Sequence, residues 1–225
     1  MARLIPTKAP NLPIAPKDWS SGFFDQFSRV LRIYFQQVDN ESSALNGPLG
    51  AKYLNSPHIS ASDSTDQYAD GDDDPTQVMW DTLEANEGFT LNLDGSATCP
   101  ASGTYKIDYS LQFVNTDNVA HDVFVWLQTN GNVTPNSSSR FTIPARKSAG
   151  VYSYLVAYSS VTFDIIAGDA IRLWWATEKA YDPVGPVDGV YMEALPAQTV
   201  PYERPANPSA VGSIVLVSGS LDTTA

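Results

Sequence analysis

Cysteine and histidine are nearly absent from this 225-residue sequence, which contains one Cys and two His. The single Cys99 excludes an intrachain disulfide and a zinc site built from clustered thiols. A Ser-His-Asp triad needs a histidine as its base, and neither His58 nor His121 lies in the Gly-x-Ser-x-Gly context of a hydrolase nucleophile. We expect both histidines to be solvent-facing loop residues. The sequence therefore predicts no catalytic residues, no cofactor and no enzymatic activity.

Basic residues are also scarce, with 13 Lys and Arg against 25 Asp and Glu and a net charge of −12. Proteins that bind a phosphate backbone neutralise it with Lys and Arg, so we expect no nucleic-acid partner. The charge is uneven, because residues 1–55 hold six basic and four acidic residues whereas the remainder holds seven and 21. This difference indicates two parts of the chain with different surroundings.

Long apolar runs are missing as well. No run reaches the ~20 residues that a membrane-spanning helix requires, and the first residues lack the apolar stretch of a secretory signal peptide. We expect no membrane insertion and no cleaved leader.

Carboxylates, in contrast, are plentiful. The stretch Asp66–Asp74 offers oxygen ligands but lacks the spacing and the terminal glutamate of an EF-hand loop, so the sequence predicts no metal site and leaves calcium binding open. Asp108, Asp164 and Asp169 fall on predicted strands or turns, and no facing pair of the glycosidase kind follows from their positions. A glycan-cleaving depolymerase remains only an alternative.

The amino-terminal 50 residues are predicted to form an extended arm followed by one amphipathic helix. Prolines punctuate residues 1–17 and favour an extended conformation there. From about Asp18 to Leu45, apolar residues recur at helical spacing and form one stripe. We predict that this stripe docks the protein onto a partner during assembly: Phe24, Phe27, Leu31, Tyr34 and Val38.

Residues 51–75 are rich in Ser, Asn, Gly and Asp, which is typical of a flexible acidic linker. From residue 76 to residue 225 the apolar period changes to two, and turn signals separate about nine short strands. With no helix among them, these strands predict a mainly β protein: an antiparallel jelly-roll sandwich preceded by the arm and the helix.

Aromatic residues are abundant, with 5 Trp, 11 Tyr and 9 Phe. Many lie on strands whose two faces are both apolar, and Tyr and Trp are enriched at subunit interfaces. Half of them fit a sandwich core, and sugar stacking at an exposed tip is an alternative for others. We predict that the following residues lie at a trimer interface: Trp126, Tyr152, Tyr154, Trp174 and Trp175.

The carboxy-terminal part resembles the trimeric jelly-roll family of tumour necrosis factor and the globular heads of complement-type collagenous proteins. The similarity rests on four segments that occur in the family's order: Gly103–Phe113, Val123–Gly131, Ile166–Trp174 and Ser209–Val217. They correspond to a Gly-x-Tyr strand, a strand ending in Asn-Gly, a Gly-Asp turn feeding a strand, and the closing strand. The resemblance implies a homotrimer with an aromatic strip at its three-fold axis.

The amino-terminal part resembles the opening of small virion proteins of short-tailed marine and cyanobacterial phages, through Asn11–Pro16, Phe23–Phe27 and Val30–Asn40. This resemblance implies a virion protein that is assembled in the host cytoplasm and docked to other virion proteins by its amino terminus. A short tail fibre or adsorption appendage is the leading interpretation, and a capsid decoration or head-fibre protein is the alternative. A module that binds or cleaves host surface glycan is a second alternative.

Overall fold

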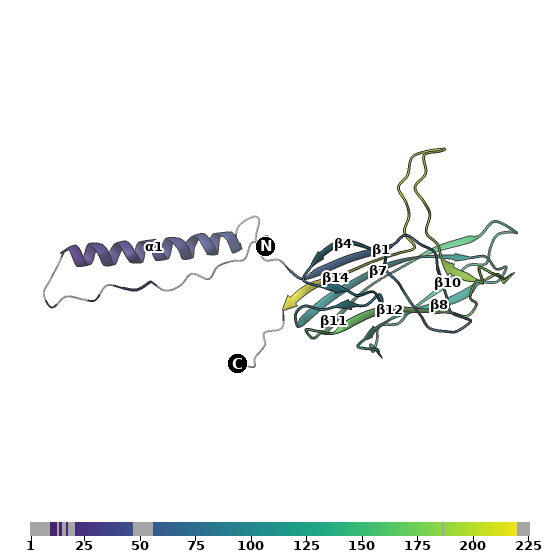
Figure 1. Cartoon of the computed structure of the whole chain (residues 1–225), viewed down its shortest axis with the longest axis horizontal. Helices are drawn as coiled ribbons and strands as arrows, with labels where there is room; N and C mark the ends of the chain where they lie inside the picture. The colour runs from purple at the N-terminus through teal and green to yellow at the C-terminus, as the bar shows by residue number, and fades with distance from the viewer. Residues whose placement is uncertain are drawn as a thin grey trace. The chain divides into compact units, whose positions relative to one another are not determined.

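The computed structural model describes residues 10–12, 14, 17, 21–46, 56–185 and 187–219. The chain divides into two compact units, Met1–Asn55 and Ser56–Ala225. The amino-terminal unit contains one helix and the second unit is built from strands (Figure 1).

Helix α1 spans Ser21–Asn46, close to the predicted range. Four of the five predicted stripe residues are half-buried, and the fifth, Phe24, is exposed. The helix also exposes Ile33 and Phe35, which are 48% and 58% accessible. Apolar side chains are thus accessible on more than one side of α1. In the described chain this helix is not long and apolar enough to cross a membrane.

Most of the predicted arm lies outside the described residues. Of its described part, Pro10 lies beside α1, where it lines a shallow hollow with Val30, Ile33 and Tyr34. Ile14 is 95% exposed. The described arm therefore leaves α1 partly uncovered.

The second unit is a sandwich of two sheets in which every paired strand is antiparallel. Sheet A contains β1 (His58–Asp63), β2 (Gln67–Tyr68), β4 (Thr82–Glu87), β7 (Gly103–Asn115), β11 (Ser153–Ile165), β13 (Val190–Met192) and β14 (Ala210–Gly219). Sheet B contains β3 (Thr76–Gln77), β5 (Thr90–Leu91), β6 (Ala97–Thr98), β8 (His121–Thr129), β9 (Asn132–Val133), β10 (Ser139–Ile143) and β12 (Ala170–Thr177).

The order of the main strands is that of a jelly roll. Sheet A runs β4-β1-β14-β7-β11, and sheet B runs β10-β8-β12-β6-β5. The chain passes between the sheets as it proceeds from β1 to β14, so the first and last strands are neighbours although more than a hundred residues separate them. Two interlocked Greek keys with this order form a jelly roll, which confirms the predicted fold class.

Side chains from the two inner faces form one core, because alternate residues of each long strand point inward. Strand β7 contributes Tyr105, Ile107, Tyr109, Leu111 and Phe113. Strands β8 and β12 of sheet B face them with Val125, Leu127, Leu173 and Trp175. The connection between β13 and β14 leaves the sandwich as a long loop that is olive in Figure 1, held by paired backbone bonds between Leu195 and Asn207 and between Gln198 and Arg204.

The prediction of a flexible linker is wrong for residues 58–75. Strand β1 lies between β14 and β4, and the buried Asp63 accepts hydrogen bonds from the Thr65 amide and hydroxyl at 2.8 and 2.6 Å. Asp72 accepts bonds from Lys179 Nζ and the Ala180 amide, both at 2.9 Å. Small polar residues can be buried here because their hydrogen-bonding groups have partners within the protein. Residues 51–55 lie outside the described part.

Candidate functional site

The five residues predicted at a trimer interface do not form one surface, and only Trp126 and Trp174 are neighbours. Trp175 is 0% exposed and packs in the core, where its ring centroid lies 5.4 Å from that of Phe113. Its neighbour Trp174 points to the outer face of sheet B, as does Trp126, which is directly opposite on β8. Tyr154 points to the outer face of sheet A. Tyr152 is half-buried just before β11.

The outer face of sheet A carries the most accessible of these side chains. Among the described strands, β11 is an edge strand, because it pairs with β7 and with no other of them. Its outward residues Tyr154, Val156 and Tyr158 are 62%, 54% and 59% exposed. Large exposed side chains of this kind in a row on an edge strand are unfavourable in water.

At Tyr154 this row meets buried side chains of the same sheet. Tyr154 is opposite Val114 on β7, Val114 is opposite Tyr191 on β13, and Tyr191 is opposite Tyr68 on β2. Val114 and Tyr191 are only 1% and 8% exposed. Val215 and Val217 of β14 are also exposed, but the charged Lys106 of β7 is opposite Val215 and separates them from the β11 row. We call the outer face of sheet A around Tyr154, Val156 and Tyr158 the sheet A face.

A cluster of three tyrosines ends the row. The ring centroids of Tyr68, Tyr181 and Tyr191 lie 4.9–5.9 Å apart, and the Tyr191 hydroxyl donates to Glu193 Oε1 at 3.1 Å. Burial raises the pKa of both Tyr191 and Glu193. Sequence reasoning missed this cluster, because Tyr181 comes from a loop and Tyr68 from the stretch interpreted as a linker.

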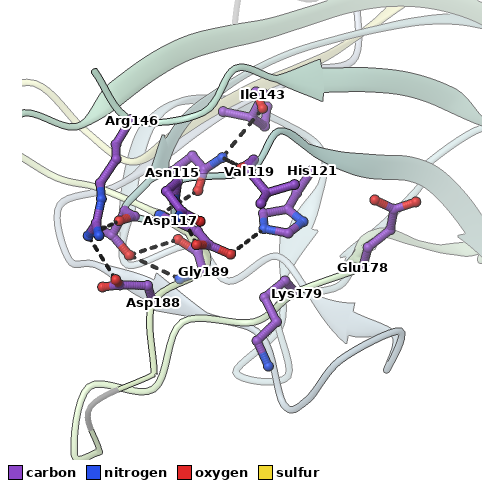
Figure 2. A network of polar contacts seen from close by, with 12 residues as sticks. Asn115, Asp117, Val119, His121, Ile143, Arg146, Glu178, Lys179, Asp188 and Gly189 are labelled. Carbon is purple, nitrogen blue, oxygen red and sulfur yellow. Dashed lines mark hydrogen bonds and ion pairs between the residues drawn. The ribbon is translucent and has the colours of Figure 1, made fainter. Parts of the chain in front are cut away.

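A second group of residues forms a polar network at one end of the sandwich (Figure 2). His121 Nε2 lies 2.8 Å from Asp117 Oδ2, and the buried Asn115 amide donates to the carbonyls of Val119 and Pro144 at 2.8 and 3.0 Å. The network joins the loop after β7 to the loop that follows β10. The prediction that His121 is a solvent-facing loop residue is wrong, because it begins β8 and its side chain is 12% exposed.

Arg146 connects the loop that contains Asp188 to this network. Its guanidinium donates to the Thr116 carbonyl at 2.8 Å and to Asp188 Oδ2 at 2.7 Å. Because each polar group binds backbone or an opposite charge, the arrangement serves to hold the three loops together.

The chemistry of hydrolysis finds no support in the described part of the chain. No hydroxyl or thiol there hydrogen-bonds to the His121 ring. Burial raises the pKa of the Cys99 thiol to about 12, which keeps it protonated and unreactive. Asp108 pairs with Lys106 at 2.9 Å, and Asp164 accepts a bond from Thr104 at 2.6 Å.

Metal ligands do not gather either. No group of three or more His, Cys, Asp or Glu side chains among the described residues is placed to hold an ion. The acidic stretch that left calcium binding open instead binds its own chain through residues such as Asp72.

Comparison with protein-family models and with curated proteins gave no match. Among solved structures, the globular domain of a zebrafish complement 1qA protein is similar over 73% of this chain and 99% of its own length. The two are 14% identical, with a TM-score of 0.43. The assignment of the jelly roll rests on the strand order described above.

Proposed function

We propose that the protein is a non-enzymatic structural component of a phage particle. In this proposal it is a homotrimer that docks to other virion proteins through its amino-terminal unit and displays the jelly roll outward as a short tail fibre or adsorption appendage. It is assembled in the host cytoplasm. A capsid decoration or head fibre is the same architecture at another place on the particle.

The observation that carries the proposal is the division of the chain into two units with different surfaces. The sandwich closes its own core within Ser56–Ala225. The helix of the other unit leaves Ile33 and Phe35 about half exposed. Fully burying such a side chain contributes roughly 1.5–3 kcal/mol, so a set of them on one helix favours association.

The sheet A face supports the homotrimer. Tyr154, Val156 and Tyr158 lie on the same outward side of one edge strand. In a closed symmetric assembly, the strip of each copy is covered by one set of residues of the next copy, and this set is the same in every copy. The edge strand β11 is then no longer exposed to solvent.

Sedimentation of the purified chain tests the homotrimer. We expect the wild type to sediment as a trimer at micromolar concentration and the double variant Tyr154→Glu, Tyr158→Glu to sediment as a monomer with an unchanged circular dichroism spectrum. Tyr202→Glu is the matched control, because Tyr202 is 65% exposed in the loop between β13 and β14. A wild-type monomer, or a trimer that both changes leave intact, contradicts the proposed interface.

A further inference from the structure

The outer face of sheet B presents an aromatic surface that the proposed trimer does not use. Trp126 on β8 and Trp174 on β12 are directly opposite each other, and Phe124 is the next outward residue of β8. Gln77 of β3 is opposite Trp174 on the other side. Gln128 and Arg172 form the neighbouring row. We call these six residues the tryptophan face.

We propose that the tryptophan face binds a neutral polysaccharide chain by stacking sugar rings on Trp126 and Trp174. The proposal deepens the proposed adsorption role by naming a ligand class and a surface. Binding by the isolated protein is a separate property, which is tested without particles.

The shape of the surface favours a saccharide. Both indoles are half-buried and lie on the outer face of sheet B. Directly opposite residues of an antiparallel pair have Cβ atoms about 4.5–5.5 Å apart. This spacing is similar to the length of one pyranose unit, whose face of C–H groups is apolar. Two adjacent sugar units therefore match two adjacent indoles.

The polar groups of the surface suit the hydroxyls of such a chain. Apolar ligand sites combine aromatic side chains with a few polar groups that fix orientation. Gln128 borders the two indoles and carries an amide side chain. Gln77 borders Trp174 on the other side, and its amide nitrogen already donates to the Asp94 carbonyl.

The charges of this face indicate that the chain is neutral. Arg172 pairs with Asp94, and Arg140, whose guanidinium lies 6.0 Å from the Phe124 ring centroid, pairs with Asp122. Each guanidinium is therefore matched by a carboxylate. Residues 56–225 hold 21 acidic and seven basic residues, which repel an acidic polysaccharide.

Affinity electrophoresis tests the proposal, with the full-length protein run in gels that contain a glucan, a mannan, a galactan or the acidic polygalacturonate. We expect at least one neutral polysaccharide to retard the wild type and polygalacturonate not to. Trp126→Ala and Trp174→Ala are expected to weaken the association by at least about tenfold. Trp126→Phe is expected to keep most of the affinity, because it keeps an aromatic ring.

Two controls separate binding from folding and from assembly. Tyr202→Ala, in the loop between β13 and β14 and outside both surfaces, is expected to leave the retardation unchanged. In the wild type, the retarding polysaccharide is also expected to shield tryptophan fluorescence from acrylamide quenching, which needs no variant. If the protein is a trimer of normal stability and no neutral polysaccharide retards it, the proposed saccharide binding by the tryptophan face is wrong. The proposed virion role is not affected by that result. The proposed saccharide binding is also wrong if polygalacturonate alone retards the protein. The same conclusion follows if the tryptophan variants bind as the wild type does.

Discussion

Asp94 shows how a single carboxylate holds a turn against a strand of the same sheet. It accepts bonds from the Ser96 hydroxyl and amide at 2.6 and 3.1 Å and pairs with Arg172. The Ser96 hydroxyl and the Arg172 guanidinium hold the pKa of Asp94 at about 2, below its ordinary value of 3.8. A carboxylate with a depressed pKa stabilises the folded state fully above its unfolded pKa, and this contribution is lost as the pH falls through the folded value.

We therefore expect Asp94→Asn to lower the free energy of unfolding at neutral pH, with the difference from wild type shrinking between about pH 4 and pH 2. Asp94 is largely exposed, so solvent screening keeps the effect small. Urea unfolding at both ends of this pH range measures it. A difference that stays the same at both ends would show that the charge of Asp94 is not what stabilises the turn.

Gly189 is the second residue whose role is specific. A Cβ atom at this position would lie 2.5 Å from the Ala180 carbonyl carbon and oxygen and 2.7 Å from the Tyr181 nitrogen. The obstacle is backbone, which cannot move aside as a side chain can. We expect Gly189→Ala to destabilise the fold by about 1–3 kcal/mol in urea unfolding.

Gly71→Ala is the matched control for this substitution. Its Cβ would meet only the Asp74 side chain, at 3.6 Å, so the change is expected to stay within about 0.5 kcal/mol. Equal effects of the two substitutions would contradict the close approach at Gly189.

Among the elements, β12 gives the sharpest contrast, because Trp174 and Trp175 are adjacent and point to opposite faces. Trp175 is fully buried and Trp174 is on the outer face. We expect Trp175→Ala to cost about 3–5 kcal/mol and Trp174→Ala clearly less. Thermal or urea unfolding of the two variants measures the difference. A larger cost for Trp174→Ala than for Trp175→Ala would mean that Trp174, and not Trp175, is the core residue of β12.

The same strand shows how far the sequence predicts the site. Strict alternation in β7 and helical spacing in α1 were sufficient to predict both elements. In β12, both faces are apolar, so the pattern alone does not determine which tryptophan enters the core. Strand β1 was missed because its sequence HISASD is short and mostly polar, and only pairing with β14 and β4 makes it a strand. The sheet A face likewise depends on which strand becomes the edge.

Helix α1 is the element that the proposal assigns to docking. Phe27 and Leu31 are half-buried members of its predicted stripe. We expect the double variant Phe27→Asp, Leu31→Asp to remain a folded trimer in solution but to be depleted from purified particles, because two carboxylates cannot enter an apolar contact without a large desolvation cost. Quantitative mass spectrometry of particles measures the copy number.

Gln36→Asp is the control for this experiment, since it adds a charge at an exposed polar position of the same helix. Normal copy number of the Phe27→Asp, Leu31→Asp variant would show that the sandwich makes the attachment instead.

At the scale of the whole molecule, each surface has a different task in the proposal. We propose that the amino-terminal unit docks, that the sheet A face joins three copies, and that the tryptophan face is left to meet a ligand. The sandwich is suited to this division because one layer can associate while the outer face of the other layer remains accessible. The polar network around Asn115 and Arg146 holds loops together at one end of the sandwich.

The most direct test of the central claim is electron microscopy of purified particles at a resolution that resolves strands. The account predicts a three-fold density in which three jelly rolls meet through β11 and project outward, with α1 at the particle surface. The position of this density, on the tail or on the capsid, distinguishes the adsorption appendage from the decoration protein. Particles that lack the protein, or that carry it as isolated single copies, would contradict the account.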